Sequence, residues 1–115
     1  MIDKEIYQKH ETPNAVMHTL AAPSTGATEL AVWTVEMRAG QAGPVHRAEH
    51  EQVWVVLDGR LAISGSEYAA GSTIVVGADE PRQVSAVTDV AALVASRGGS
   101  TVATSEGTRP LPWAA

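Results

Sequence analysis

The side chains best suited to chemistry near neutral pH lie between residues 46 and 54, with one more at position 82. His46 carries an imidazole, whose ordinary pKa near 6.5 allows it to take or give a proton at neutral pH. Gln52 can orient a carbonyl or hydroxyl group, and Trp54 shares its strand parity, so that it either stacks on a flat ligand or fills the core. Arg82 is a permanent cation that needs an anionic partner if it is buried. Together these residues predict a site for a small organic molecule that is anionic or forms an enolate.

The partner of Arg82 has two alternatives at this point. One is a ligand carboxylate, phenolate or enolate. The other is a carboxylate of the chain itself, for which Glu36, Glu51 and Asp79 are the candidates.

These residues must be positioned by strands. Ala31, Trp33, Val35 and Met37 alternate with more polar residues, which predicts a strand with one buried face. The turn signals Asp58-Gly59 and Thr88-Asp89 each lie between apolar runs and predict hairpins, which would pair 53–57 with 61–64 and 83–87 with 90–95. Further strands are expected at 15–20, 73–76 and 101–104, and residues 65–71 are expected to form a short connection that contains Tyr68.

The chain of 115 residues suits one domain. No segment has a convincing helical period, and many short strands with close turn signals predict an all-β sandwich or barrel. We expect the barrel at about residues 28–97, a polar N-terminal arm at 1–14 and a proline-limited C-terminal tail at 105–115. The isomer of the Glu80–Pro81 bond stays open.

The run Val53–Leu57 is apolar on both strand faces. A strand in a sheet with one solvated face would alternate instead. One face is therefore expected to fill the barrel, and a terminal segment or a second subunit is expected to cover the other. We predict a homodimer on this basis.

The spacing of residues 40–59 resembles the first motif of the cupin family. That motif runs from Gly through five residues to His-x-His, then Glu, then Gly six residues later; here Gly40, His46, Gln52 and Gly59 occupy matching positions. Gln52 replaces the Glu, and Ala48 stands at the second His. The resemblance implies a cupin-type jelly-roll β-barrel. Within the family, the chain resembles small single-domain cupins of polyketide or related specialised metabolism.

The family's second motif is matched less fully. Gly71 fits its first position, Gly77 and Asp79 replace its Pro and Gly, and Arg82, after Pro81, stands at its His. In the family the three His and the Glu bind a divalent metal inside the barrel.

Carried over to this chain, the family's metal ligands become His46, Ala48, Gln52 and Arg82. Alanine has no donor atom, and a protonated guanidinium has no lone pair for a cation. No firm cofactor is therefore expected. A weakly bound divalent metal held by His46, His50 and Gln52 is the alternative; otherwise His50 is a solvent-facing turn residue.

Composition excludes several other functions. The net charge of −5 and the scattered basic residues argue against nucleic-acid binding and against an anionic membrane surface. The absence of Cys excludes disulfides and thiolate chemistry. Because neither a signal peptide nor a membrane span is visible, we expect a cytoplasmic protein.

Three functions fit the sequence. The first is an enzyme of specialised metabolism, a cyclase or isomerase with His46 as acid/base and Arg82 stabilising an enolate, independent of metal. Gln52, Trp54 and His50 would then contact the substrate. The second is a metal-dependent cupin oxygenase that uses His46, His50 and Gln52. The third is a cupin that binds a small ligand without catalysis.

Overall fold

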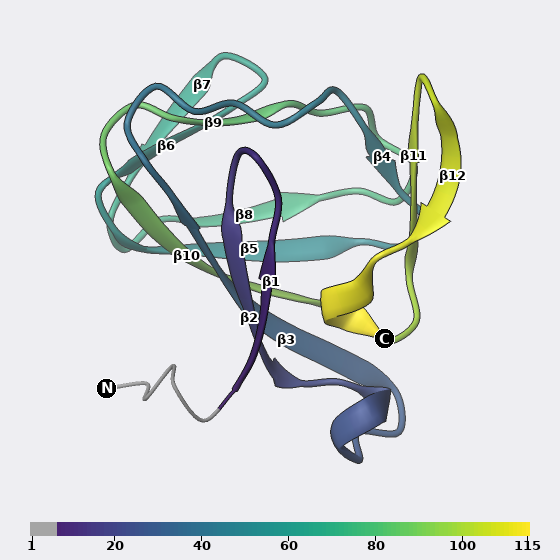
Figure 1. Ribbon diagram of the computed structural model, residues 1–115. Helices are drawn as coiled ribbons and strands as arrows, with labels where there is room; N and C mark the ends of the chain where they lie inside the picture. Colours follow the sequence, from purple (N-terminus) through teal and green to yellow (C-terminus); the bar gives the residue numbers. More distant parts are fainter. Residues whose placement is uncertain (1–6) are drawn as a thin grey trace.

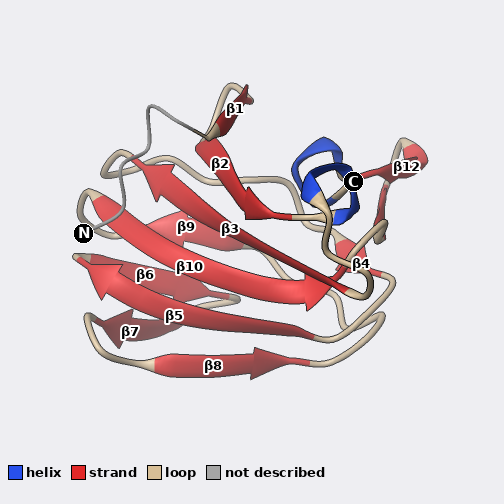
Figure 2. Ribbon diagram, turned by 90° about the horizontal axis from the view of Figure 1, so that it is seen from below, coloured by secondary structure: helices blue, strands red, loops and turns tan. Residues whose placement is uncertain are grey.

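The computed structural model describes residues 7–115 and is built almost entirely from antiparallel strands (Figures 1 and 2). Among residues 7–115 the helical segments are two short 3-10 turns, and no helix in this part of the chain has the length and apolar character of a membrane span. The strands are β1 (Gln8–Glu11), β2 (Val16–Ala21), β3 (Leu30–Met37), β4 (Arg47–Ala48), β5 (Gln52–Asp58), β6 (Arg60–Ile63), β7 (Ser66–Ala69), β8 (Thr73–Val76), β9 (Val84–Ala86), β10 (Val90–Arg97), β11 (Thr101–Thr104) and β12 (Gly107–Pro110). The 3-10 turns are η2 (Pro23–Thr25) and η3 (Pro112–Ala114). This confirms the predicted all-β class.

The strands form one large sheet and two small ones. The large sheet has the order β1-β2-β3-β10-β5-β8, and the small ones have the orders β7-β6-β9 and β12-β11-β4. Figure 2 looks onto the outer face of the large sheet, with β6, β7 and β9 behind it. The apolar core lies between these layers, where inward side chains from opposite sheets meet.

The alternation predicted around residues 31–38 is observed in β3. Ala31, Trp33, Val35 and Met37 are all buried, at 0–6 % exposure. Their intervening neighbours point to the outer face of the sheet, as the period of a strand requires. This strand thereby supplies much of the inner wall of the barrel.

Both predicted hairpins are wrong. Strand β5 pairs with β10 and β8, whereas β6, which follows it, pairs with β7 and β9. Likewise β9 pairs with β6, and β10 pairs with β3 and β5. The two turn signals mark corners at which the chain passes from one sheet to the other.

The two corners are held against each other, which explains why they replace hairpins. The Arg60 N–H donates to Thr88 Oγ1 at 2.9 Å, and the Val87 N–H donates to the Arg60 carbonyl at 3.0 Å. Gly59 has φ +80° and lies so close to the Asp89 carbonyl that a Cβ would overlap it. Only glycine satisfies both conditions. Backbone contact between distant segments has therefore overridden the local hairpin preference.

The ends of the chain are more ordered than expected. Residues 1–6 of the predicted arm 1–14 lie outside the described residues, and its later part contains β1, which pairs with β2 in the large sheet outside the predicted limits of 28–97. The tail 105–115 contributes β12 and the 3-10 turn η3, and its Leu111 and Ala114 are buried. The expected connection around Tyr68 is the strand β7. The described chain contains no cis peptide bond, so Glu80–Pro81 is trans.

Candidate functional site

A cavity of about 540 Å³ opens on one side of the barrel. Its floor comes from the inner faces of β2, β3 and β5, and its rim from the β1–β2 turn, the β11–β12 hairpin and η3. The volume suits a molecule of drug-like size. The lining residues include Met17, Trp33, Val35, Met37, His46, Gln52, Trp54, Val84, Glu106, Arg109 and Trp113.

All three tryptophans of the chain line this cavity. Trp33 on β3 and Trp54 on β5 lie on either side of Val94 in β10, and Trp113 comes from η3 near the C-terminus. Met17 and Met37 complete the apolar wall. Large aromatic faces and adaptable thioethers favour a flat, largely apolar ligand. The sequence left Trp113 without a role, because nothing local shows that the tail folds back on the barrel.

His46 lies at this cavity next to Arg82. The two residues form an isolated antiparallel bridge, in which each backbone N–H donates to the other's carbonyl at 2.9 Å. The His46 side chain donates from Nδ1 to the Pro44 carbonyl at 3.0 Å, since a carbonyl can only accept. In the neutral ring this leaves the lone pair on Nε2. Burial lowers the pKa of His46, the contact with Pro44 raises it, and the nearby charge of Arg82 lowers it. The net effect lowers the pKa of His46, which favours the neutral ring.

Gln52 lies on the cavity floor with its amide held in one orientation. It is 3 % exposed, and its Oε1 accepts a hydrogen bond from the Trp54 indole N–H at 3.0 Å. An indole N–H can only donate, so the oxygen and nitrogen of the amide cannot exchange places without losing this bond. The Gln52 NH2 group is thereby the part left for a ligand, and it donates. Trp54 fills the core and also fixes this donor.

Arg82 is a buried cation that forms no ion pair with a carboxylate of residues 7–115. Its exposure is 2 %, and its Nη2 donates to the Gly77 carbonyl at 3.3 Å, while Nε and Nη1 have no partner. Within residues 7–115 no ion pair joins Arg82 to Glu36, Glu51 or Asp79. Burial lowers the pKa of Arg82, and the charge of Glu80 opposes that shift.

The position of Arg82 differs from that of His46 in one respect. Arg82 is not among the residues that line the cavity, although its backbone is hydrogen-bonded to that of His46. In an antiparallel sheet, residues that are directly opposite point to the same face. The Arg82 side chain is therefore expected on the same face of the two segments as the His46 side chain, and its charge lowers the pKa of His46.

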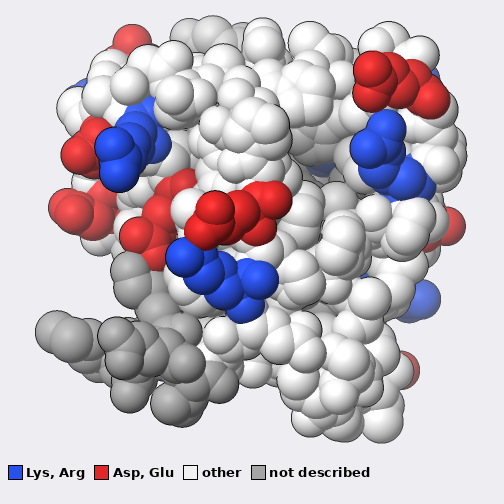
Figure 3. All heavy atoms as spheres, in the orientation of Figure 1, with Lys and Arg blue, Asp and Glu red and all other residues white. Residues whose placement is uncertain are grey.

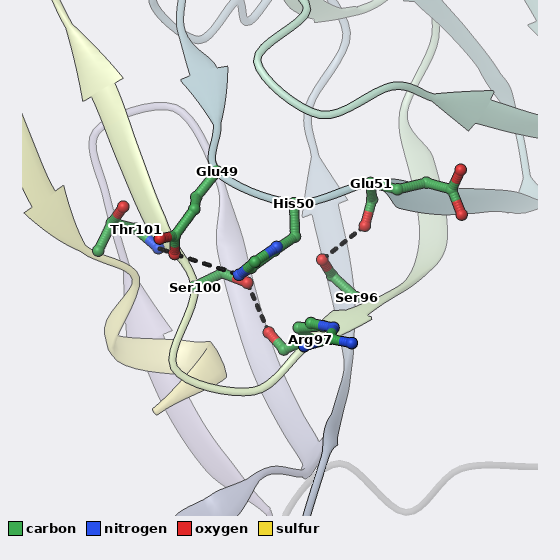
Figure 4. A network of polar contacts seen from close by, with 7 residues as sticks. All are labelled: Glu49, His50, Glu51, Ser96, Arg97, Ser100 and Thr101. Atoms are coloured by element: carbon green, nitrogen blue, oxygen red, sulfur yellow. Dashed lines mark hydrogen bonds and ion pairs between the residues drawn. The ribbon is translucent and has the colours of Figure 1, made fainter.

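His50 lies outside the cavity. It is located in the bend between β4 and β5, and its Nε2 is 3.4 Å from Glu49 Oε1 (Figure 4). Glu49 Oε1 also accepts from the Thr101 N–H at 3.3 Å. Figure 4 shows this group near the Ser100 and Arg97 backbone, where Ser100 Oγ donates to the Arg97 carbonyl at 2.6 Å. The structure thus brings His46, Gln52 and Trp54 together and leaves His50 apart.

The donor atoms present do not fit a bound transition metal. At the four positions implied by the cupin resemblance, His46 offers one nitrogen, Ala48 offers nothing, and Arg82 brings a positive charge. The fourth, Gln52, already uses its oxygen to accept from Trp54. Among the described residues no cluster of three or more His, Asp or Glu side chains is arranged to hold a metal.

Glu106 and Arg109, the acidic and basic residues that line the cavity, lie at its rim, whereas other ion pairs lie elsewhere on the surface. Glu106 Oε2 and Arg109 Nη2, both on the β11–β12 hairpin, are 3.4 Å apart. Lys9 Nζ and Glu11 Oε1 are 2.7 Å apart on β1. On the face drawn in Figure 3, basic side chains mostly lie beside acidic ones. The interior of the cavity therefore differs sharply from its charged rim.

Comparison with solved structures identifies the fold. An RmlC-like cupin from Shewanella frigidimarina NCIMB 400 superposes with a TM-score of 0.70 at 18 % identity, covering 84 % of this chain and 88 % of that one. This chain has the cupin fold. The polyketide cyclase RemF from Streptomyces resistomycificus gives a TM-score of 0.72 at 18 % identity, covering 84 % of this chain and 78 % of the cyclase.

Cupins of other activities are also similar. Salicylate 1,2-dioxygenase from Pseudoaminobacter salicylatoxidans gives a TM-score of 0.65 at 20 % identity, with 80 % of this chain covering only 27 % of the dioxygenase. No protein-family model matches the sequence, and no curated protein matches it. The cupin fold thus leaves the chemistry to be argued from the site.

Proposed function

We propose that this protein is a small-molecule enzyme that performs acid/base chemistry on a flat, enolisable or phenolic ligand inside the cupin barrel, without a metal. The observation that carries the proposal is the hydrogen bond from Trp54 to Gln52 Oε1. It turns the residue at the usual carboxylate-ligand position into a hydrogen-bond donor. A donor at that position suits a ligand oxygen and opposes a cation.

The residues divide the work between them. His46 Nε2 takes a proton from carbon or oxygen of the ligand, because burial keeps the ring neutral and Pro44 fixes its tautomer. The Gln52 NH2 group donates to the oxygen on which negative charge develops. The positive charge of the buried Arg82, which does not line the cavity, stabilises that anion through space. Return of the proton from His46 to another ligand atom completes an isomerisation or permits a ring-closing step.

The ligand class follows from the cavity wall. Three tryptophans and two methionines around about 540 Å³ favour a molecule of two or three fused rings. The similarity to a polyketide cyclase supports a substrate from polyketide or related specialised metabolism.

The experiment uses naphthoresorcinol as a probe, since this flat phenol exchanges ring C–H protons through its keto form. Deuterium incorporation is followed by NMR with the purified protein. We expect the protein to accelerate the exchange, His46→Asn to abolish the acceleration and still bind, and Val45→Ala, whose exposed side chain is not among those that line the cavity, to behave as wild type. Unchanged exchange with His46→Asn would remove His46 as the base.

A non-catalytic ligand binder is the second candidate, favoured by the enclosed aromatic cavity itself. It predicts quenching of tryptophan fluorescence by the probe with no accelerated exchange. The metal-dependent oxygenase is less well supported, because His50 lies outside the cavity and Gln52 presents a donor. A stoichiometric transition metal in the purified protein would reverse that order.

A further inference from the structure

The cavity has a cationic side chain at its mouth. Among the described residues that line the cavity, Arg109 on β12 is the one lysine or arginine. Strand pairing places it directly opposite Val102 of β11, which lines the cavity and packs against the core. Residues directly opposite in an antiparallel pair present their side chains on the same face. Arg109 therefore belongs to the cavity side of the β11–β12 hairpin, together with Val102 and Thr104.

The ion pair of Arg109 with Glu106 leaves the guanidinium able to bind a ligand. The contact joins Arg109 Nη2 to Glu106 Oε2 at 3.4 Å, whereas close charge-assisted hydrogen bonds measure about 2.7–2.9 Å. The two side chains are 61 % and 79 % exposed, and water screens a pair of this kind. Within residues 7–115 Glu106 is the one side-chain partner of Arg109. The planar guanidinium has five N–H donors in a fork that matches a carboxylate, so a ligand can share it with Glu106 or displace Glu106 from it.

The two ends of the cavity differ in polarity. At the floor, Trp33 and Gln52 are 2 % and 3 % exposed, so that end is aromatic and shielded from water. At the mouth, Arg109 shares the lining with Thr12 and Asn14 of the β1–β2 turn, in which Thr12 Oγ1 accepts from the Asn14 N–H at 3.3 Å. A ligand complementary to both ends has fused rings at the floor and an anionic group at the mouth.

We propose that Arg109 is a specificity-determining residue that binds a carboxylate at the mouth of the cavity. The substrate is then a fused-ring phenol with a carboxylic acid on the ring that lies farthest from the reacting carbon. A planar, singly charged carboxylate suits the guanidinium fork, whereas Glu106 repels a doubly charged phosphate more strongly. This assignment rests on the proposed function, in which His46 and Gln52 contact the opposite ring. Arg109 holds the ligand in that orientation.

The test compares 5,7-dihydroxy-2-naphthoic acid with its methyl ester by isothermal titration calorimetry at neutral pH and low ionic strength. The acid carries its charge on the ring without hydroxyl groups, and the ester has the same rings without the charge. We expect the wild type to bind the acid roughly tenfold more tightly than the ester, and added salt to reduce this preference. Arg109→Gln should remove the preference and keep the affinity for the ester within about twofold, which also shows that the variant is folded. Glu106→Gln should strengthen binding of the acid, because it removes the competing carboxylate.

Arg60→Gln is the matched control, because Arg60 forms another exposed ion pair, with Glu67 at 3.5 Å, and is not among the residues that line the cavity. It should leave both affinities unchanged. Failure of the wild type to bind the acid, equal affinities for acid and ester, or an equal loss of both ligands in Arg109→Gln would each overturn the proposal.

Deuterium exchange of naphthoresorcinol distinguishes this proposal from the proposed function, because that probe has no carboxylate. A preserved preference for the acid without accelerated exchange supports the role of Arg109 in binding and refutes the proposed chemistry alone. Accelerated exchange without a preference for the acid refutes the role of Arg109 alone.

Discussion

Replacing Trp54 by Phe removes the indole N–H that Gln52 Oε1 accepts at 3.0 Å. Gln52 is 3 % exposed and Trp54 is 7 % exposed, so water reaches the orphaned oxygen poorly. Leaving a buried acceptor unsatisfied costs about 1–3 kcal/mol of folding free energy. Trp54→Phe also removes ring area, which lowers stability for an unrelated reason. The contribution of the hydrogen bond to the unfolding free energy must therefore be measured separately from the contribution of packing.

A double-mutant cycle with Gln52→Met makes that separation. Methionine keeps the length of the glutamine side chain and cannot accept from the indole. Trp54→Phe should then cost about 1–2 kcal/mol less in the Gln52→Met background than in the wild type, because both polar groups are gone. The free energies come from urea unfolding followed by far-ultraviolet circular dichroism, since Trp54 contributes to the fluorescence.

The same cycle decides the functional reasoning. If the two substitutions add within about 0.5 kcal/mol, the hydrogen bond does not hold the Gln52 amide, and the donor assignment fails. If they couple as expected, Trp54→Phe should also weaken binding of naphthoresorcinol, because the freed amide can turn its oxygen toward the ligand. Val45→Ala should change neither quantity.

Three further predictions concern other parts of the chain. Because burial lowers the pKa of His46, the unfolded chain binds a proton more readily than the folded chain, so the free energy of unfolding should fall as pH drops through about 6.5 and should level off below the folded pKa. Unfolding free energies of wild type and His46→Asn across this range test the prediction, and identical profiles would contradict it. Arg82→Met should leave stability equal or higher, because it removes a buried charge with two unpaired nitrogens, and it should weaken binding of phenolates; a strongly destabilised variant would show that Arg82 has a structural partner. Gly59→Ala should cost at least about 2 kcal/mol more than Gly65→Ala, because both glycines have positive φ but only at Gly59 does a Cβ meet the Asp89 backbone; equal melting temperatures would refute the close approach.

Much of the fold was predictable from local pattern. The alternation at Ala31, Trp33, Val35 and Met37 fixes which side of β3 faces the core, because successive side chains in a strand point to opposite faces. The apolar run that begins at Val53 predicted a strand with two apolar faces, and β5 has them. The spacing of Gly40, His46, Gln52 and Gly59 indicated the cupin fold before any strand was paired.

Strand pairing was not predictable in the same way. A turn signal such as Asp58-Gly59 reports that the chain bends, but it does not report which strand lies alongside. That choice depends on contacts between distant segments, such as Gly59 with Asp89. Both hairpin predictions failed for this reason.

For the site, the sequence identified His46, Gln52, Trp54 and Arg82, because their residue types and positions in the motif are local facts. Tertiary structure decided how they are placed. Trp113 lines the cavity, whereas His50 and Arg82 are not among its lining residues. The fold also turned the Gln52 amide into a donor. The positions of Trp113 and Arg82 depend on which segments meet across the fold, and a linear pattern carries no information about such meetings. The Trp54–Gln52 bond joins two side chains on one face of β5, so its parity was visible in the sequence and only its geometry required the structure.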